Sequence, residues 1–369
     1  MDFDIVVIGA GIAGATAAAH LSPYRRVALI EAEQSAGYHT TGRSAALWIQ
    51  NYGPHDVREL SRLSRAFFET PPPGFAAVPL MRQRTVLLVA TEAQLPNLDE
   101  AMRNGIGLRR VTAAEAAGLL PAIRPGAIAA GAVEDDAFDM DVSAIHQGFL
   151  RQLHENKGML ALRHRAGAIE RRGAQWHATT TTGEIVRAPI IVNAAGAWGD
   201  EVAALAGVAP LGLTPKRRTA ALIEPSPYDP EHWPMICDIE EQWYARPEAR
   251  TRLMVSPADE TPSFPHDVQP EEIDVALGID RMQQVLDIEV RRVEHKWAGL
   301  RTFTPDGSLA FGWDTKMEGF FWSVGQGGYG IQTSPAAGQL VADLVLGRAP
   351  GDAAAIATTV DPGRFQPPA

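Results

Sequence analysis

The sequence has little cysteine, fewer basic than acidic residues and few long apolar runs. Its single cysteine, Cys237, excludes an intramolecular disulfide framework and Cys-rich zinc or iron–sulfur sites. Nothing in this thiol content points outside the cytoplasm, which is the compartment that we expect. Lys plus Arg number 33 and Asp plus Glu 44, and the net charge of −11 argues against nucleic acid or an anionic membrane surface as a partner.

Several catalytic motifs are also missing. Paired cysteines, His-Glu-x-x-His and Gly-x-Ser-x-Gly do not occur, so hydrolase activity and a bound metal have no support. Residues 5–21 are nearly all apolar or glycine, but Asp2 and Asp4 replace the basic start of a signal peptide, and glycines interrupt the run. No other stretch reaches the roughly 18–20 apolar residues of a membrane span. We therefore expect no integral membrane segment.

The composition, 46% hydrophobic and 21% charged, is typical of a globular protein. At roughly 150 residues per domain, 369 residues predict two intertwined domains or one large one. A strand–turn–helix–strand pattern over residues 4–30 predicts a βαβ unit, and α/β material returns near the end after β-rich stretches. We predict an α/β fold in which a Rossmann-like domain carries an inserted antiparallel-sheet (α+β) substrate domain. The Rossmann-like domain comprises residues 1–80, 140–215 and 300–369, and the insert comprises 81–139 and 216–299.

Local patterns predict several further elements. Apolar periodicity indicates helices over 56–69, 271–286 and 331–346. Thr-x-x-Gln from Thr91 and Thr-x-x-Glu from Thr112 predict capped helix starts, and Asp141 is a candidate N-cap. A meander is expected over 159–164, 168–172, 175–180 and 189–193. Residues 36–54 are expected to form a loop that is long enough to be functional.

A glycine motif follows the first expected strand. Gly9, Gly11 and Gly14 form Gly-x-Gly-x-x-Gly at the start of the expected helix, where a tight turn, close approach of a pyrophosphate and helix–strand packing each exclude a side chain. Glu31 closes the second strand about 20 residues along, where a carboxylate can accept a ribose hydroxyl. The motif predicts a dinucleotide site and leaves NAD and FAD open.

The next segment, residues 38–46 (Tyr-His-Thr-Thr-Gly-Arg-Ser-Ala-Ala), resembles the second flavin-contacting loop of the D-amino-acid oxidase (DAO) superfamily of FAD-dependent amine oxidoreductases. The resemblance continues through residues 192–198, 300–307, 325–330 and 362–365. Within the superfamily, the chain is most similar to D-amino-acid dehydrogenases of the D-arginine dehydrogenase type. That similarity is carried by residues 37–46, 210–218, 297–301 and 325–334.

The resemblance implies a Rossmann-like fold of the glutathione-reductase type with noncovalent FAD. The pyrophosphate is expected at the first helix N-terminus, and the isoalloxazine ring between the two domains. A covalent link through His39, which lies in the flavin loop, stays open as an alternative. The positions that match cofactor-binding residues are Gly9, Gly11, Ile12, Ala13, Gly14, Glu31, Ala32, Thr41, Gly42, Arg43, Ser44, Ala45, Ala168, Ala195, Gly196, Trp198, Gly327, Gly328, Tyr329, Gly330, Ile331 and Gln332.

The resemblance also implies the catalytic residues. Arg218 and Arg301 match arginines that bind a substrate carboxylate, a task suited to a planar, bidentate guanidinium. Tyr52 and Tyr244 match tyrosines that line the substrate pocket, and the loop position of Tyr52 makes a lid a further hypothesis. The free N–H groups of the last helix are expected to stabilise negative charge on the reduced flavin.

The chain departs from D-arginine dehydrogenases in the pocket. Leu47 and Ile49 stand where those enzymes carry polar residues, and Val86 stands where a carboxylate would receive a cationic side chain. No acidic residue lies between positions 79 and 90, and burying a cation without a partner costs several kcal/mol. We therefore predict a pocket, formed by Leu47, Ile49, Val86 and Gln332, for D-amino acids with neutral, largely apolar side chains. N-methyl amino acids and cyclic imino acids stay open.

The reaction implied is oxidative deamination. Hydride leaves the α-carbon for flavin N5, and the imino acid hydrolyses to a 2-oxo acid and ammonia. A quinone or another acceptor then reoxidises the flavin. Two alternatives remain, an oxygen-using oxidase of glycine, sarcosine or another secondary amine, and a non-catalytic flavin-binding subunit of a larger dehydrogenase.

Overall fold

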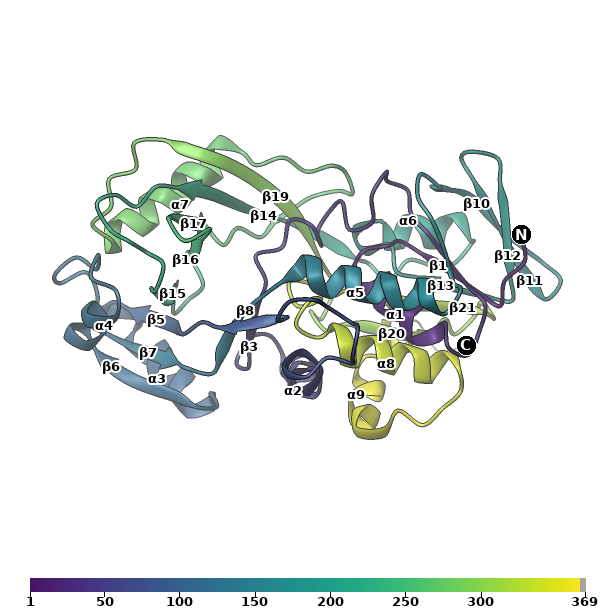
Figure 1. The fold of residues 1–369 in the computed structure, drawn as a ribbon, viewed down its shortest axis with the longest axis horizontal. Helices are drawn as coiled ribbons and strands as arrows, with labels where there is room; N and C mark the ends of the chain where they lie inside the picture. Colours follow the sequence, from purple (N-terminus) through teal and green to yellow (C-terminus); the bar gives the residue numbers. More distant parts are fainter. Residues whose placement is uncertain (366–369) are drawn as a thin grey trace.

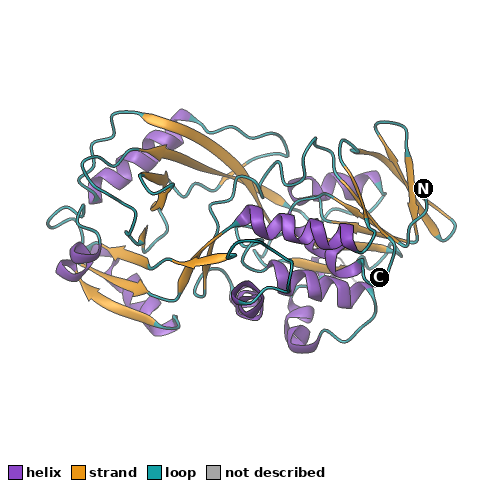
Figure 2. Cartoon of the chain, in the orientation of Figure 1, coloured by secondary structure: helices purple, strands orange, loops and turns teal. Residues whose placement is uncertain are grey.

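The structure is a computed structural model that describes residues 1–365. It has two halves, each built on one large sheet (Figure 1). The parallel-sheet half lies to the right in Figure 1 and contains the N-terminus, and the nine-strand half lies to the left. Figure 2 shows strands running through both halves, with several helices gathered beside the parallel sheet. The chain passes between the halves several times, as predicted for a domain with an insert.

The parallel sheet is buried on both faces. Its strand order is β20-β21-β13-β1-β2-β9, and β20 alone runs antiparallel to its neighbour. In β1 (Ile5–Ile8), Ile5 and Val7 pack in the same cluster as residues of α1 (Ile12–Leu21) and α8 (Ser334–Val345), whereas Val6 and Ile8 pack toward β10–β12. Burial on both faces explains why this strand is apolar at every position.

The remaining elements of this half complete the two layers. The other strands of the parallel sheet are β2 (Val27–Ile30), β9 (Met159–Ala161), β13 (Ile190–Asn193), β20 (Ala310–Trp313) and β21 (Phe320–Val324). A separate three-stranded antiparallel sheet contains β10 (Ala166–Arg172), β11 (Gln175–Thr180) and β12 (Ile185–Ala188). The further helices are α2 (His55–Glu69), α5 (Val142–Glu155), α6 (Gly199–Leu205) and α9 (Ala354–Thr359).

The nine-stranded sheet follows the order β18-β14-β17-β16-β15-β5-β7-β6, with β19 paired to β14. One of its faces packs against the helices α4 and α7. Its strands are β5 (Val86–Ala90), β6 (Leu108–Thr112), β7 (Ala130–Glu134), β14 (Thr214–Ile223), β15 (Met235–Asp238), β16 (Tyr244–Glu248), β17 (Arg252–Ser256), β18 (Thr261–Pro262) and β19 (Val293–Phe303). Its helices are α3 (Leu95–Asn104), α4 (Ala113–Leu119) and α7 (Glu272–Val285).

A small sheet joins the two halves. It consists of β3 (Leu47–Ile49), β8 (Ala137–Met140) and β4 (Met81–Gln83), in the order β3-β8-β4. In Figure 1, β3 and β8 lie in the middle of the molecule. This sheet carries the chain from the flavin loop into the wall of the site.

Several sequence predictions are confirmed. Helices α2 and α7 begin and end within one residue of the predicted bounds. The two predicted Thr capping boxes form, although a 3-10 turn follows Thr91, and the side chain of Asp141 accepts from Ala144 N–H as an N-cap. Short-range hydrogen bonds decide these features, so a local pattern is sufficient to predict them.

Other expectations were wrong. The meander contains only β10–β12, because β9 and β13 pair with strands of the parallel sheet and β12 was missed. The long loop contains β3, which forms only because β8 pairs with it. The inserted sheet is not wholly antiparallel, since β5 and β15 come from different segments and run parallel. The last helix begins at Ser334 rather than at position 331, with Pro335 in its first turn, where proline is favoured.

The predicted division into two domains stays a prediction, and residues 366–369 lie outside the described part. Strand β14 starts at Thr214 and β19 ends at Phe303. Within residues 1–365, no helix combines the length and apolarity that crossing a membrane requires.

Candidate active site

A cavity of about 630 Å³ opens where the two halves meet. This volume lies within the range of roughly 300–1,000 Å³ that is usual for ligand and cofactor sites. One end is formed by the turn between β1 and α1, and the other by strands β5, β14, β15, β16 and β19 of the nine-stranded sheet. A molecule that fills the cavity therefore contacts both halves.

The glycine motif brings the backbone of the first helix close to its neighbours. Gly9 has φ +98°, and a Cβ there would lie 2.6 Å from the carbonyl oxygen of Ala194. A Cβ on Gly14 would overlap the carbonyl oxygen of Gly9. Gly11 is the N-cap residue of α1 and has no side chain to cap the helix. Gly11, Ile12 and Ala13 all line the cavity. The three glycines therefore add no side chain of their own at the N-terminus of α1, as a pyrophosphate site requires.

Two side chains hold Ala10 in this turn. Glu31 Oε2 accepts from Ala10 N–H at 2.7 Å, and His146 Nε2 donates to the Ala10 carbonyl at 2.9 Å. Burial lowers the pKa of His146, which favours the neutral imidazole that makes this bond. Glu31 also lines the cavity, as predicted for a residue that meets a ribose. The sequence provided no signal for His146, which lies 136 residues away from Ala10.

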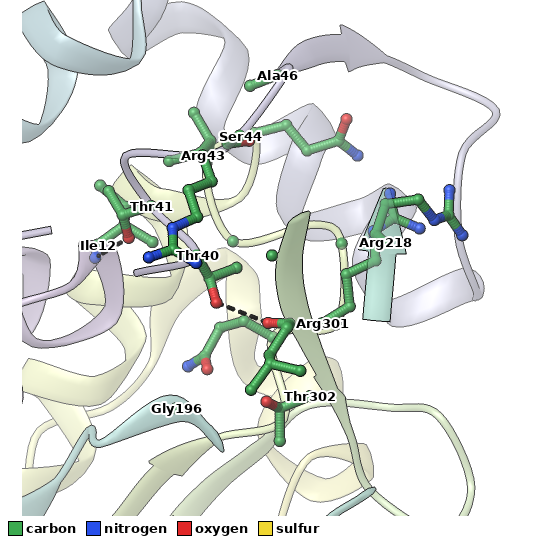
Figure 3. Close-up of a pocket in the computed structure, with 18 of the residues that line it drawn as sticks. Ile12, Thr40, Thr41, Arg43, Ser44, Ala46, Gly196, Arg218, Arg301 and Thr302 are labelled. Carbon is green, nitrogen blue, oxygen red and sulfur yellow. Dashed lines mark hydrogen bonds between the residues drawn. The ribbon is translucent and has the colours of Figure 1, made fainter. Parts of the chain in front are cut away.

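The flavin loop ties the two halves together. Thr41 Oγ1 accepts from Ile12 N–H at 2.9 Å, and Thr40 Oγ1 donates to the carbonyl of Leu300 on β19 at 2.6 Å (Figure 3). Arg43 Nη1 donates to the carbonyls of Val268 and Ala298, both at 3.0 Å, and Arg43 also pairs with Asp267. Arg43 lines the cavity, but its guanidinium mainly holds the loop against the nine-strand half.

Most of the other predicted cofactor residues line the same cavity. They are Ala32, Ser44, Ala45, Ala195, Gly196, Trp198, Gly327, Gly328, Gly330, Ile331 and Gln332. Gly14, Gly42 and Tyr329 are not in the wall itself; Gly42 packs on Gly37. Ala168 also lies outside the wall, and Ala166, two residues earlier in β10, lines it instead. The ring of His39 lies 4.5 Å from that of Trp198, and its Nε2 lies 3.1 Å from Glu33.

These residues fit FAD. The glycine-flanked N-terminus of α1 lies at the same cavity as the carboxylate of Glu31, and Gly327, Gly328 and Gly330 line that cavity too. The first two suit a pyrophosphate and a ribose. Within residues 1–365, no group of three or more His, Cys, Asp or Glu side chains is placed to hold a metal ion.

Arg301, on β19, provides the cationic group of the site. Its Nη2 donates to Tyr52 Oη at 2.9 Å, and no carboxylate of the described residues forms an ion pair with it. Its guanidinium lies against Gly328, where a Cβ would approach Cζ to 2.5 Å. Burial opposes its charge, but interactions with the phenols of Tyr52 and Tyr244 raise the pKa of Arg301 overall. The cavity wall therefore holds a charged guanidinium without an acidic partner.

Tyr52 lies in the loop after β3. Its ring packs edge-on against Tyr329, with centroids 5.1 Å apart. Burial raises the pKa of Tyr52, so the phenol stays protonated. Because its oxygen already accepts from Arg301, its own hydrogen is available to donate to a ligand. Tyr244, on β16, lines the same cavity.

Arg218, on the adjacent strand β14, has a different environment. Its Nε donates to the carbonyl of Asp259 at 2.9 Å, and its Nη2 lies 3.2 Å from Glu260 Oε1. Both Arg218 and Arg301 line the cavity (Figure 3). Of the two arginines predicted to bind a carboxylate, only Arg301 lacks a carboxylate partner among residues 1–365.

The wall beside Tyr52 and Arg301 is largely apolar. It is formed by Leu47, Ile49, Val86, Leu88, Met235 and Cys237, which belong to one cluster. Burial raises the pKa of the Cys237 thiol well above its ordinary value. Gln332 also lines the cavity, but both ends of its amide are used, since it accepts from Ile49 N–H at 3.2 Å and donates to Ser61 Oγ at 2.8 Å.

The sequence analysis missed the acidic residues Glu134, Asp238 and Glu241, which line the cavity. Glu134, on β7, lies directly opposite Val86 in the sheet and lines the cavity. The absence of acids between positions 79 and 90 therefore does not mean that none is near Val86. Strand pairing brings Glu134 there from 48 residues further along the chain, which no local pattern shows. Burial raises the pKa of its carboxyl group, although hydrogen bonds from Asn51 and Gln50 oppose the shift.

Comparison with known proteins agrees with this geometry. The family described as FAD dependent oxidoreductase (DAO) matches residues 4–344. A Xenopus laevis protein called FAD-dependent oxidoreductase domain-containing protein 1 is 27% identical over 180 residues, which are 44% of this chain and 35% of that protein. A D-amino acid dehydrogenase of Xanthobacter autotrophicus is 43% identical over 54 residues, 15% of this chain and 13% of that enzyme. The chain thus matches about a third or less of the length of these relatives.

Solved structures share the whole fold. Glycine oxidase from Geobacillus kaustophilus has a TM-score of 0.82 at 20% identity, covering 94% of this chain and 95% of that one. L-proline dehydrogenase from P. horikoshii has a TM-score of 0.80 at 20% identity, covering 98% and 97%. The family match over residues 4–344, together with the fitted dinucleotide site, shows that this chain is an FAD-binding member of the FAD dependent oxidoreductase (DAO) family.

Proposed function

We propose that the protein oxidises D-amino acids with neutral, largely apolar side chains to 2-oxo acids and ammonia. The observation that carries this proposal is the charged Arg301, which forms no ion pair within the described residues and bonds to Tyr52 beside an apolar wall. A cation without an acidic partner is costly to bury, so its presence in a cavity favours an anionic ligand group. The α-carboxylate of an amino acid is such a group.

The chain's own residues bind and orient the substrate. Arg301 and the hydroxyl of Tyr52 donate to the α-carboxylate, and charge-assisted bonds of this kind offset its desolvation. The apolar wall that contains Leu47, Ile49 and Val86 takes the side chain and excludes water. Bound FAD supplies the acceptor for the hydride that leaves the α-carbon. The imino acid is then released and hydrolyses in water, and a quinone or another acceptor takes the electrons.

Three finer points belong to the same proposal. The D configuration is supported by the resemblance to D-amino-acid dehydrogenases in residues 37–46, 210–218, 297–301 and 325–334. Noncovalent attachment of FAD is supported by His39, which is engaged with Glu33 and Trp198. Preference for an apolar side chain is supported by the cluster of Leu47, Ile49, Val86, Leu88, Met235 and Cys237 that lines the cavity.

Anaerobic bleaching of the bound flavin tests the proposal. We expect D-leucine to bleach the yellow colour, whereas L-leucine and D-arginine leave it unchanged or act far more slowly. Bleaching by D-arginine with the best kcat/KM of a D-amino-acid panel would refute the apolar pocket. Bleaching only by sarcosine or proline would move the assignment to secondary amines. No bleaching by any amine would indicate a non-catalytic subunit, and hydrogen peroxide formed in air at the turnover rate would indicate an oxidase.

A further inference from the structure

Glu134 occupies an unusual place in the wall of the cavity. It is the last residue of β7 and is 3% exposed. In the sheet it lies between Val86 on β5 and Leu108 on β6, and all three residues line the cavity. A buried carboxylate between two apolar neighbours is stable only if hydrogen bonds compensate its desolvation.

Those hydrogen bonds come from the loop that carries Tyr52. Glu134 Oε1 accepts from Gln50 N–H at 3.0 Å and from Asn51 N–H at 3.4 Å. These amides immediately precede Tyr52, whose hydroxyl meets Arg301. The carboxylate of Glu134 thus connects the backbone of residues 50–51 to strand β7 of the nine-stranded sheet.

Further bonds hold the same loop at its sides. The side chain of Asn51 donates to the carbonyl of Ile106 at 2.9 Å and accepts from Ile106 N–H at 2.7 Å. On the other side, Arg58 Nε donates to the Gly53 carbonyl at 2.8 Å. Neither contact comes from a strand of the nine-stranded sheet. Among the contacts named here, the loop meets that sheet at Glu134 on β7 and, through the Tyr52 hydroxyl, at Arg301 on β19.

We propose that Glu134 is a positioning residue: it holds the backbone of residues 50–51 so that Tyr52 bonds both Arg301 and the substrate carboxylate. The inference deepens the proposed function and rests on it for the identity of the substrate. Glu134 acts through Tyr52 and does not contact the reacting atoms. Its two backbone bonds need an acceptor oxygen rather than a negative charge, so a glutamine can replace it and an apolar residue cannot.

Hydrogen exchange of the holoenzyme tests the positioning directly and needs no substrate. We expect Glu134→Leu to speed exchange of the amides of residues 50–52 at least tenfold, and Glu134→Gln to leave it near the wild-type rate. Asp135→Asn is the matched control, because Asp135 is the next residue, is exposed and does not line the cavity. If Glu134→Leu fails to fold, Glu134→Asp is the second variant. Its side chain is one methylene shorter, so its oxygen lies farther from the two amides, and exchange of residues 50–52 should be faster than in the wild type but slower than expected for Glu134→Leu. Unchanged exchange in the folded Leu or Asp variant would overturn the proposal.

A double-mutant cycle tests the route through Tyr52. We expect Glu134→Leu and Tyr52→Phe each to lower kcat/KM for D-leucine about tenfold, mainly by raising KM. The double variant should have about the same kcat/KM as either single variant. Glu134→Gln should restore activity. Independent, multiplying effects would contradict the positioning role. So would a Glu134→Gln variant that keeps slow exchange but loses oxidation of cationic substrates, since Glu134 would then be a direct substrate ligand.

The two experiments separate this inference from the proposed function. Faster exchange in Glu134→Leu without oxidation of any amino acid would support the positioning of the loop and refute the assigned substrate. Bleaching by D-leucine together with unchanged exchange in Glu134→Leu would support the assigned substrate and refute the positioning role of Glu134.

Discussion

Arg301 and Arg218 look alike in the sequence but differ in their partners. Glu260 and the Asp259 carbonyl satisfy Arg218, whereas Arg301 has Tyr52 and the open cavity. We expect Arg301→Lys to lower kcat/KM for the amino acid roughly 10- to 100-fold, because each lost charge-assisted hydrogen bond is worth about 1.5–3 kcal/mol. Flavin content should not change. Arg218→Lys is the comparison in steady-state kinetics, and an equal or larger loss there would mean that Arg218 carries the carboxylate.

The sequence could predict which residues belong to the site better than it could predict the partners of each residue. The motifs identified Tyr52, Tyr244, Arg218 and Arg301 as a group, and the structure brings all four to one cavity. The motifs could not show which arginine is neutralised, because Asp259 and Glu260 lie more than 40 residues from Arg218 and reach it only through the folding of the sheet. For the same reason Glu134 was missed.

At the scale of the element, we expect helix α1 to bind the cofactor, and a substitution of Gly14 tests this expectation. A Cβ at Gly14 would overlap the Gly9 carbonyl, so Gly14→Ala must push α1 away from β1. We expect overpacking to destabilise the protein by about 1–3 kcal/mol and to lower bound flavin. Gly118→Ala, in α4, is the control, because nothing lies within 4 Å of its Cβ. That change should stabilise by roughly 0.5–1 kcal/mol. Urea unfolding and the ratio of flavin to protein absorbance measure both; full flavin in Gly14→Ala would contradict the role of the close contact.

Elements with local signals were predicted and elements that depend on partners were not. Helix α2 shows its apolar stripe in the sequence, and Thr112 and Asp141 show their caps. By contrast, β3 has three residues and exists only as the partner of β8, and β9 joins β2 from 129 residues away. A short apolar run does not indicate whether the strand pairs within a meander or within a parallel sheet, so the pairing of β9 with β2 could not be predicted.

At the scale of the whole molecule, FAD should act as part of the structure. The cavity is walled by both halves, and the flavin loop links them through Thr40 and Arg43. A ligand that binds only the folded state adds stability as RT ln(1 + [L]/Kd), about 2.7 kcal/mol at 100 times Kd. We therefore expect removal of FAD to lower Tm by several degrees and to speed proteolysis within residues 36–54. Adding FAD should reverse both changes.

FMN provides the control that connects this effect to the sequence motif. It carries the isoalloxazine ring and one phosphate but lacks the adenosine half, which should lie at Glu31 and the glycine turn. If those residues bind the cofactor, FMN at the same free concentration should restore only a fraction of the Tm change that FAD restores. Glu31→Gln should narrow the difference between the two flavins, because it weakens the bonds to the ribose hydroxyls that only FAD offers there. Equal protection by FMN and FAD in the unmodified protein would mean that the glycine turn and Glu31 shape the fold without holding the dinucleotide.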